Sequence, residues 1–96
     1  MSTRDTILSI LRVLRPELVA KYRVRSLALF GSYARGDQTD VSDIDVLVDV
    51  DPAIGLGFVE LGDYLEAKLG RPVDLVSADA VKPRYRREIE KDLLYV

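Results

Sequence analysis

The sequence predicts a small α/β (α+β) domain in which three strands alternate with helices. Three apolar segments have the length of strands, at about residues 26–30, 43–50 and 73–76. Between and around them, apolar residues recur at the three- and four-residue spacing of helices that bury one face. Elements in this order build a sheet covered by helices. We therefore expect residues 1–96 to form one domain, with helices on one face of the sheet and a polar site on the other.

The first expected helix has a polar start and an interruption near its middle. Ser2 to Asp5 has the spacing of a capping box, in which side chains satisfy the free N–H groups of the first turn. Ile7, Leu11 and Leu14 then recur on one helical face. Because proline lacks an N–H group and crowds the preceding turn, we expect Pro16 to break or restart this helix.

Two further helices are expected, one before and one after the third strand. Apolar residues at helical spacing over residues 58–69 predict the first of them, which Gly70 and Pro72 should end. The segment 77–79 is expected to cap the second, with Pro83 in its first turn.

Two pairs of polar or small residues indicate the location of a candidate active site. Gly31 and Ser32 directly follow the first strand, where such a corner opens backbone N–H groups toward an anion. In the second strand the even-numbered residues 44–50 are apolar and share one face, so Asp43 and Asp45 share the other, within reach of a common cation. A phosphate cradle beside a carboxylate pair is what metal-assisted chemistry on a nucleoside triphosphate requires.

Each of these features also has an ordinary structural explanation. A glycine–serine pair after a strand is usually only a tight turn, and alternating aspartates often form a solvated strand face. Their combination in this order favours a functional site. Carboxylates this close repel one another in the folded state unless a cation or solvent relieves them.

The pattern Gly-Ser-x10-Asp-x-Asp, from Gly31 to Asp45, resembles the motif of the DNA-polymerase-beta-like nucleotidyltransferase superfamily. The fuller strings Gly31-Ser32-Tyr33-Ala34-Arg35-Gly36 and Ser42-Asp43-Ile44-Asp45 resemble its minimal branch, the MNT proteins. Many MNT proteins are encoded as antitoxins beside a HEPN-domain toxin. The resemblance implies the nucleotidyltransferase fold, with a mixed sheet of three to four strands.

The resemblance also implies three metal-binding carboxylates. Asp43 and Asp45 would bind Mg²⁺ or Mn²⁺, and a third carboxylate is expected on the next strand. Asp74, in the apolar segment 72–76, matches that position. Asp74 would lie near the acceptor hydroxyl and accept its proton.

The same resemblance places the nucleotide. Gly31 and Ser32 would hold the β- and γ-phosphates of ATP, and Arg35 would neutralise triphosphate charge, because a guanidinium binds phosphate oxygens in bidentate fashion. An ion pair between Arg35 and Asp37 or Asp40 is the alternative.

Composition narrows the chemistry further. The chain has no cysteine and no histidine, which excludes thiolate chemistry, cysteine-based zinc sites and a histidine general base. A site built from carboxylates alone favours Mg²⁺ or Mn²⁺ over zinc. No apolar run approaches the roughly 20 residues of a membrane span, and the N-terminus lacks a signal-peptide core, so we expect a cytoplasmic protein without membrane contact.

The charges are segregated along the chain, although the net charge is only −2. Residues 37–66 hold nine acidic side chains and no basic one, which disfavours direct nucleic-acid binding. Basic residues gather in segments 1–25 and 82–91. These two ends could meet and hold a triphosphate or an acidic partner, or they could be solvated helix faces.

The resemblance implies an enzyme, an ATP-dependent protein adenylyltransferase that modifies a hydroxyl, typically of tyrosine, on a partner HEPN toxin. A core of 96 residues has little surface to enclose both nucleotide and acceptor, so a partner protein or a second copy should present the acceptor in a homo- or hetero-oligomer. The apolar segment 93–96 could contact that partner or fold back onto the core. The alternatives are an antitoxin that acts by contact alone, and nucleotidyl transfer to a small molecule such as an aminoglycoside.

Overall fold

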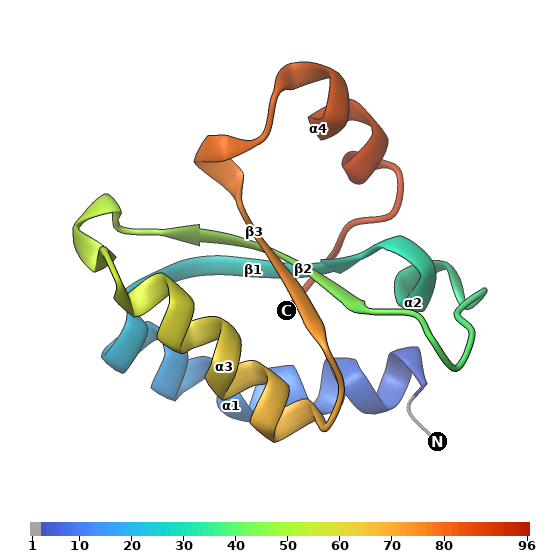
Figure 1. Ribbon diagram of the computed structural model, residues 1–96, viewed down its shortest axis with the longest axis horizontal. Coiled ribbons are helices and arrows are strands. Elements are labelled where there is room, and N and C mark those ends of the chain that lie inside the picture. Colours follow the sequence, from blue (N-terminus) through green and yellow to red (C-terminus); the bar gives the residue numbers. More distant parts are fainter. Residues whose placement is uncertain (1–2) are drawn as a thin grey trace.

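The computed structural model describes residues 3–96, which form a four-stranded mixed sheet with helices on both of its faces (Figure 1). The strand order is β3-β2-β1-β4, in which β2 and β3 are parallel and the other two pairs are antiparallel. The mixed sheet expected from the sequence is therefore confirmed. The elements are α1 (Arg4–Tyr22), β1 (Val24–Phe30), α2 (Gly31–Arg35), β2 (Ile44–Val50), α3 (Gly57–Leu69), β3 (Val73–Ser77), α4 (Pro83–Glu90) and β4 (Leu94–Tyr95).

The core lies between the sheet and the helices α1 and α3, which pack together on one face. The pairing of β1 with β2 sets Leu27 opposite Val48 and Leu29 opposite Val46, and all four side chains are buried there. Burial of each large aliphatic side chain contributes about 1.5–3 kcal/mol. A slip of one residue would turn this set to the other face, so the core fixes the register of the strands that carry the site.

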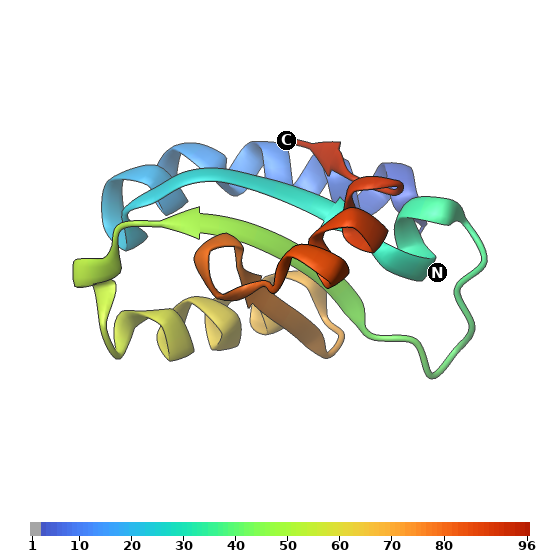
Figure 2. The same cartoon turned by 90° about the horizontal axis from the view of Figure 1, so that it is seen from above.

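The opposite face of the sheet is covered in part by α4 (Figures 1 and 2). The prediction that helices lie on one face only is wrong for this element. Leu47 supplies the physical reason, because it shares the face of Asp45 and is nevertheless only 3% exposed. The apolar side chains on this face must be shielded from water, and α4 shields some of them. Since α1 and α4 lie on opposite faces of the sheet, the basic side chains of these two helices do not meet.

Helix α1 continues through Pro16 without a break, so the expected interruption is wrong. Proline removes one hydrogen bond, but Pro16 lies on the exposed side of the helix, where water reaches the free carbonyl. Leu11 and Leu18, on either side of it, are fully buried against the sheet and keep the helix in place. The N-cap is Thr3, whose hydroxyl accepts a hydrogen bond from the Thr6 N–H at 3.3 Å. The predicted cap at Ser2 lies outside the described residues.

The C-terminal elements differ from the prediction in two ways. The segment 77–79 does not cap α4, because it ends β3 and enters a short 3-10 helix (Ala78–Ala80). Lys82 is the N-cap instead, and Pro83 occupies the first turn as expected. The apolar segment 93–96 folds back to form β4, which pairs with β1. Across the described residues, no helix is long and apolar enough to cross a membrane.

Candidate active site

The turn from β1 into α2 depends on Gly31. Its φ of 73° lies in the left-handed region, which costs other residues roughly 1–2 kcal/mol. A Cβ added at this position would overlap Oδ2 of Asp45. A glycine is therefore required for this corner to lie in contact with the Asp45 carboxylate.

Helix α2 is held in place by its own buried residues. Tyr33 is 2% exposed and packs in the core, so it neither stacks on a ligand nor lies on the surface. At the other end of α2, the Gly36 N–H donates to the Ser32 carbonyl at 2.8 Å. The helix thus holds Ser32 beside the corner, at the edge of a cleft.

Strand pairing brings the predicted carboxylates together. Phe30 pairs with Asp45, and Asp45 pairs in turn with Asp74 on the parallel neighbour β3. Directly opposite residues point to the same face of a sheet, so Asp45 and Asp74 lie side by side on the face that α4 partly covers. Asp43 precedes β2 and is exposed at the margin of the site.

Arg35 forms two ion pairs in the structure. Its Nε lies 3.0 Å from Oδ2 of Asp37, and its Nη1 lies 2.8 Å from Oδ2 of Asp92. The hydrogen bonds to Asp37 and then Asp92 raise the pKa of the guanidinium above its ordinary value. The ion pair with Asp37 is one of the alternatives left open by the sequence, yet Arg35 also lines the cleft beside Gly31. The position of Arg35 therefore allows it both to pair with these aspartates and to face a ligand in the cleft.

Comparison with known proteins shows which family this chain belongs to. The model of the nucleotidyltransferase domain family matches residues 11–96. The chain belongs to this family. A solved structure of a minimal nucleotidyltransferase superposes with a TM-score of 0.81 at 29% identity, covering 97% of this chain and 95% of that one. The minimal nucleotidyltransferase fold expected from the sequence is confirmed.

Two further relatives are similar over nearly the whole chain. The protein adenylyltransferase MntA of Thermococcus cleftensis is 41% identical, and the match covers 100% of this chain and 98% of that protein. A toxin–antitoxin crystallised with AMP-PNP superposes with a TM-score of 0.66 at 26% identity, over 98% of this chain and 72% of that one. These relatives place the chain among the nucleotidyltransferase enzymes.

The electrostatics of this nucleotidyltransferase centre on Asp45. Burial raises the pKa of its carboxyl group from 3.8 to about 6, and the negative charges of Asp74 and Asp43 add to the rise. The positive charge of Arg35 acts in the opposite direction. A half-buried carboxylate beside two others carries charge that a cation would relieve.

The donor set fits a magnesium ion that is bound together with a substrate. Within residues 3–96, no three carboxylates stand close enough to hold an ion by themselves. Mg²⁺ is usually held by one or two carboxylates plus substrate phosphates, rather than by a cage made of protein alone. Asp45 and Asp74, which lie side by side next to the Gly31 corner, can supply these two carboxylates. The oxygen ligands favour Mg²⁺ or Mn²⁺ over softer metals.

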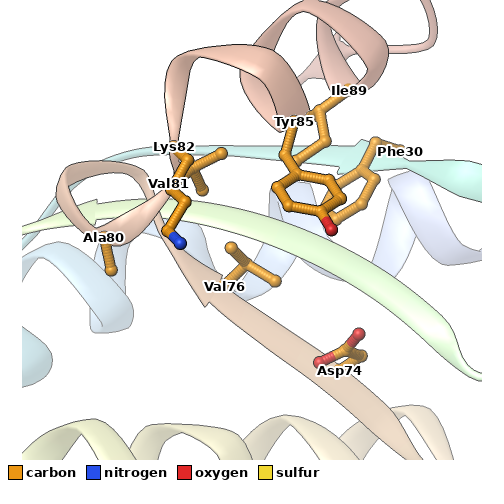
Figure 3. Close-up of a pocket in the computed structure, with 8 residues that line it drawn as sticks. All are labelled: Phe30, Asp74, Val76, Ala80, Val81, Lys82, Tyr85 and Ile89. Atoms are coloured by element: carbon orange, nitrogen blue, oxygen red, sulfur yellow. The ribbon is translucent and has the colours of Figure 1, made fainter.

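Two adjoining clefts meet at the carboxylates. The polar cleft, of about 370 Å³, is lined by Gly31, Ser32, Arg35 and Asp45 on one side and by Glu88 and Asp92 on the other. The apolar pocket, of about 440 Å³, lies under α4 beside Asp74 (Figure 3). Phe30 and Ile89 line both of them, so the two adjoin, and together they are called the groove.

Sequence reasoning missed the residues of the C-terminal segment that line this groove. Tyr85 and Ile89 belong to α4, and Asp92 to the turn before β4. The amphipathic spacing of Tyr85 and Ile89, four residues apart, was the available signal that one side of α4 faces protein. Nothing in the local pattern indicated which face of the sheet that would be.

Proposed function

We propose that this nucleotidyltransferase transfers AMP from ATP to a hydroxyl group of a HEPN-domain partner protein, and so acts as the antitoxin of that partner in the cytoplasm. The acceptor is a tyrosine, and the reaction requires Mg²⁺ or Mn²⁺. One observation carries the proposal: Asp45 lies between the Gly31 corner and Asp74, in register across three strands. The similarity to a protein adenylyltransferase and to a toxin–antitoxin crystallised with AMP-PNP supports it.

The proposed reaction is an in-line displacement at the α-phosphorus of ATP. The acceptor oxygen forms a bond to this phosphorus while the bond to the oxygen that bridges to the β-phosphorus breaks. Pyrophosphate leaves, and the hydroxyl proton passes to Asp74. Asp45 and Asp74 would hold Mg²⁺, which would neutralise charge on the phosphates and make the acceptor hydroxyl more acidic.

The remaining polar residues of the groove bind the leaving group. The Ser32 hydroxyl and the N–H groups of the first turn of α2 donate hydrogen bonds to the β- and γ-phosphates. Arg35 adds a positive charge beside them. Each charge-assisted hydrogen bond of this kind contributes about 1.5–3 kcal/mol.

The position of Asp74 explains why a second protein supplies the acceptor. Asp74 is exposed, and β3 is the edge strand of the sheet on that side. A hydroxyl that approaches Asp74 therefore comes from outside this edge. A flexible or extended segment of a partner can reach it, and docking of the partner would hold the acceptor in place.

The test is label transfer from α-labelled ATP to the partner in the presence of Mg²⁺. The Asp45→Asn variant should lose roughly 10³-fold or more in rate, because metal-assisted charge stabilisation is worth several kcal/mol. Asp49→Asn is the matched control, since Asp49 lies on the same strand but pairs with Arg25 at 3.6 Å. It should keep the wild-type rate.

Two results would contradict the proposal. Transfer that continues undiminished in excess EDTA would remove the metal from the mechanism. If Asp45→Asn still neutralises the toxin fully in cells, the protein is an antitoxin that acts by contact alone.

A further inference from the structure

The apolar pocket under α4 has no role in the chemistry described so far. Phe30 and Val76 form its floor on the sheet, and Tyr85 and Ile89 contact it from α4 (Figure 3). Lys82 and Asp74 are the charged side chains at its edge. The Tyr85 side chain is 59% exposed, a large aromatic surface that the described residues leave uncovered.

We propose that this pocket binds the purine base of the nucleoside triphosphate, with the base stacked against the ring of Tyr85. The proposal rests on the proposed function, because it requires that the triphosphate occupies the polar cleft. It assigns a binding site to residues that the reaction itself does not use. It also gives α4 a function, as the element that closes the nucleoside onto the sheet.

The first argument is that the two parts of the groove adjoin. Phe30 and Ile89 line both the polar cleft and the apolar pocket. A nucleotide whose β- and γ-phosphates lie at Gly31 has its α-phosphate near the Asp45 and Asp74 pair. The ribose and base then extend from that point along the groove, and the apolar pocket begins there.

The second argument is the direction of the reaction. The phosphate corner, Asp45 and Asp74 lie in one row across the strands, because Phe30 pairs with Asp45 and Asp45 with Asp74. In an in-line displacement the acceptor stands opposite the leaving pyrophosphate, which places it beyond Asp74 at the β3 edge. The nucleoside leaves the α-phosphorus at an angle to this row. The apolar pocket lies beside Asp74, between the sheet and α4, and offers space for the nucleoside.

The third argument is the chemistry of the pocket lining. Aromatic and aliphatic side chains dominate it, as in sites that bind flat rings by stacking. The guanidinium of Arg84 lies 5.9 Å from the centroid of the Tyr85 ring and helps to hold the ring in position. The Lys82 ammonium is placed at the edge, where it can donate a hydrogen bond to a ring nitrogen or carbonyl of the base.

The test uses the absence of tryptophan from the chain. In the Tyr85→Trp variant the introduced indole is the only one, so its fluorescence reports on the pocket alone. ATP with Mg²⁺ should quench this fluorescence, whereas inorganic tripolyphosphate with Mg²⁺ should bind without quenching it. Calorimetry then compares both ligands in Tyr85→Ala and Tyr85→Phe. Loss of the ring should weaken ATP binding about fivefold or more and leave tripolyphosphate unchanged, and Tyr85→Phe should bind like the wild type.

Three outcomes separate the possibilities. Unchanged ATP affinity in Tyr85→Ala, with no fluorescence response, would overturn the base site. If the same variant instead raises the KM for the partner, the pocket receives the acceptor side chain. If the wild-type protein binds neither ATP nor tripolyphosphate, the proposed function itself fails, and the base site fails with it.

Discussion

Replacement of Asp45 by asparagine should stabilise the protein while it abolishes the reaction. The ordinary pKa of the carboxyl group is 3.8, and burial with two neighbouring carboxylates raises it to about 6. A group whose pKa is higher in the folded state binds more protons there, so folding becomes less favourable as the pH rises from about 4 to 6. At a fully buried site a shift of this size would cost about 3 kcal/mol. Asp45 is only half-buried, so solvent screening reduces the cost to about 1–2 kcal/mol, fully present above pH 7. Asparagine has the same shape and no charge, and removes this cost.

Urea denaturation of the metal-free protein measures the effect. At pH 8 we expect Asp45→Asn to gain about 1–2 kcal/mol in the free energy of unfolding and to raise the Tm by about 4 °C or more, with almost no gain at pH 4. Asp49→Asn, which removes a charge from a surface ion pair on the same strand, should change stability by less than about 1 kcal/mol. Mg²⁺ with ATP should stabilise the wild type but not Asp45→Asn. An Asp45→Asn variant as stable as the wild type at both pH values would refute the electrostatic reasoning.

The other predictions concern the phosphate side of the groove. Gly31→Ala should lose ATP affinity in calorimetry. In the control Gly36→Ala the added Cβ meets no atom within 4 Å, so this variant should keep its ATP affinity and lose only about 1–2 kcal/mol of stability. Equal ATP affinity in the two variants would show that Gly31 is only a turn residue. Asp92→Asn removes a negative charge from the polar cleft and frees Arg35, so ATP affinity should rise several-fold. Asp37→Asn is the control, because Asp37 does not line the cleft and is far more exposed; the same rise in both variants would show that the position of Asp92 has no special effect.

Much of the fold could be predicted from the sequence because the residues that face the core recur at the regular spacing of a strand or a helix. The alternation of apolar and polar residues predicts the buried face of β2, and the helical spacing of apolar residues predicts that of α3. The uninterrupted α1 was not, because the cost of Pro16 is local and its compensation by the packing of Leu11 and Leu18 is tertiary. The placement of β4 was also out of reach, since Leu94 pairs with Leu29, far away in the sequence.

The candidate site divides in the same way, into residues found from local patterns and residues placed by contacts distant in the sequence. Gly31, Asp45 and Asp74 were accessible because the corner and the strand alternation are local patterns, and the resemblance connected them. Asp92 contacts Arg35 across 57 residues of chain, and no local pattern indicates such a contact. The pocket residues of α4 were missed for a related reason. Their role depends on which face of the sheet the helix covers, and only the three-dimensional arrangement decides that.

The central claim is that this protein transfers AMP covalently to a partner, and the intact mass of that partner tests it most directly. The HEPN-domain protein is incubated with ATP, Mg²⁺ and either the wild type or Asp74→Asn. The wild type should add the mass of one or more adenylyl groups, located on tyrosine by fragmentation. Asp74→Asn should form the same complex and add none, because the proton acceptor is gone while the docking surface is intact. A partner whose mass is unchanged in a stable wild-type complex would contradict the account and leave neutralisation by contact.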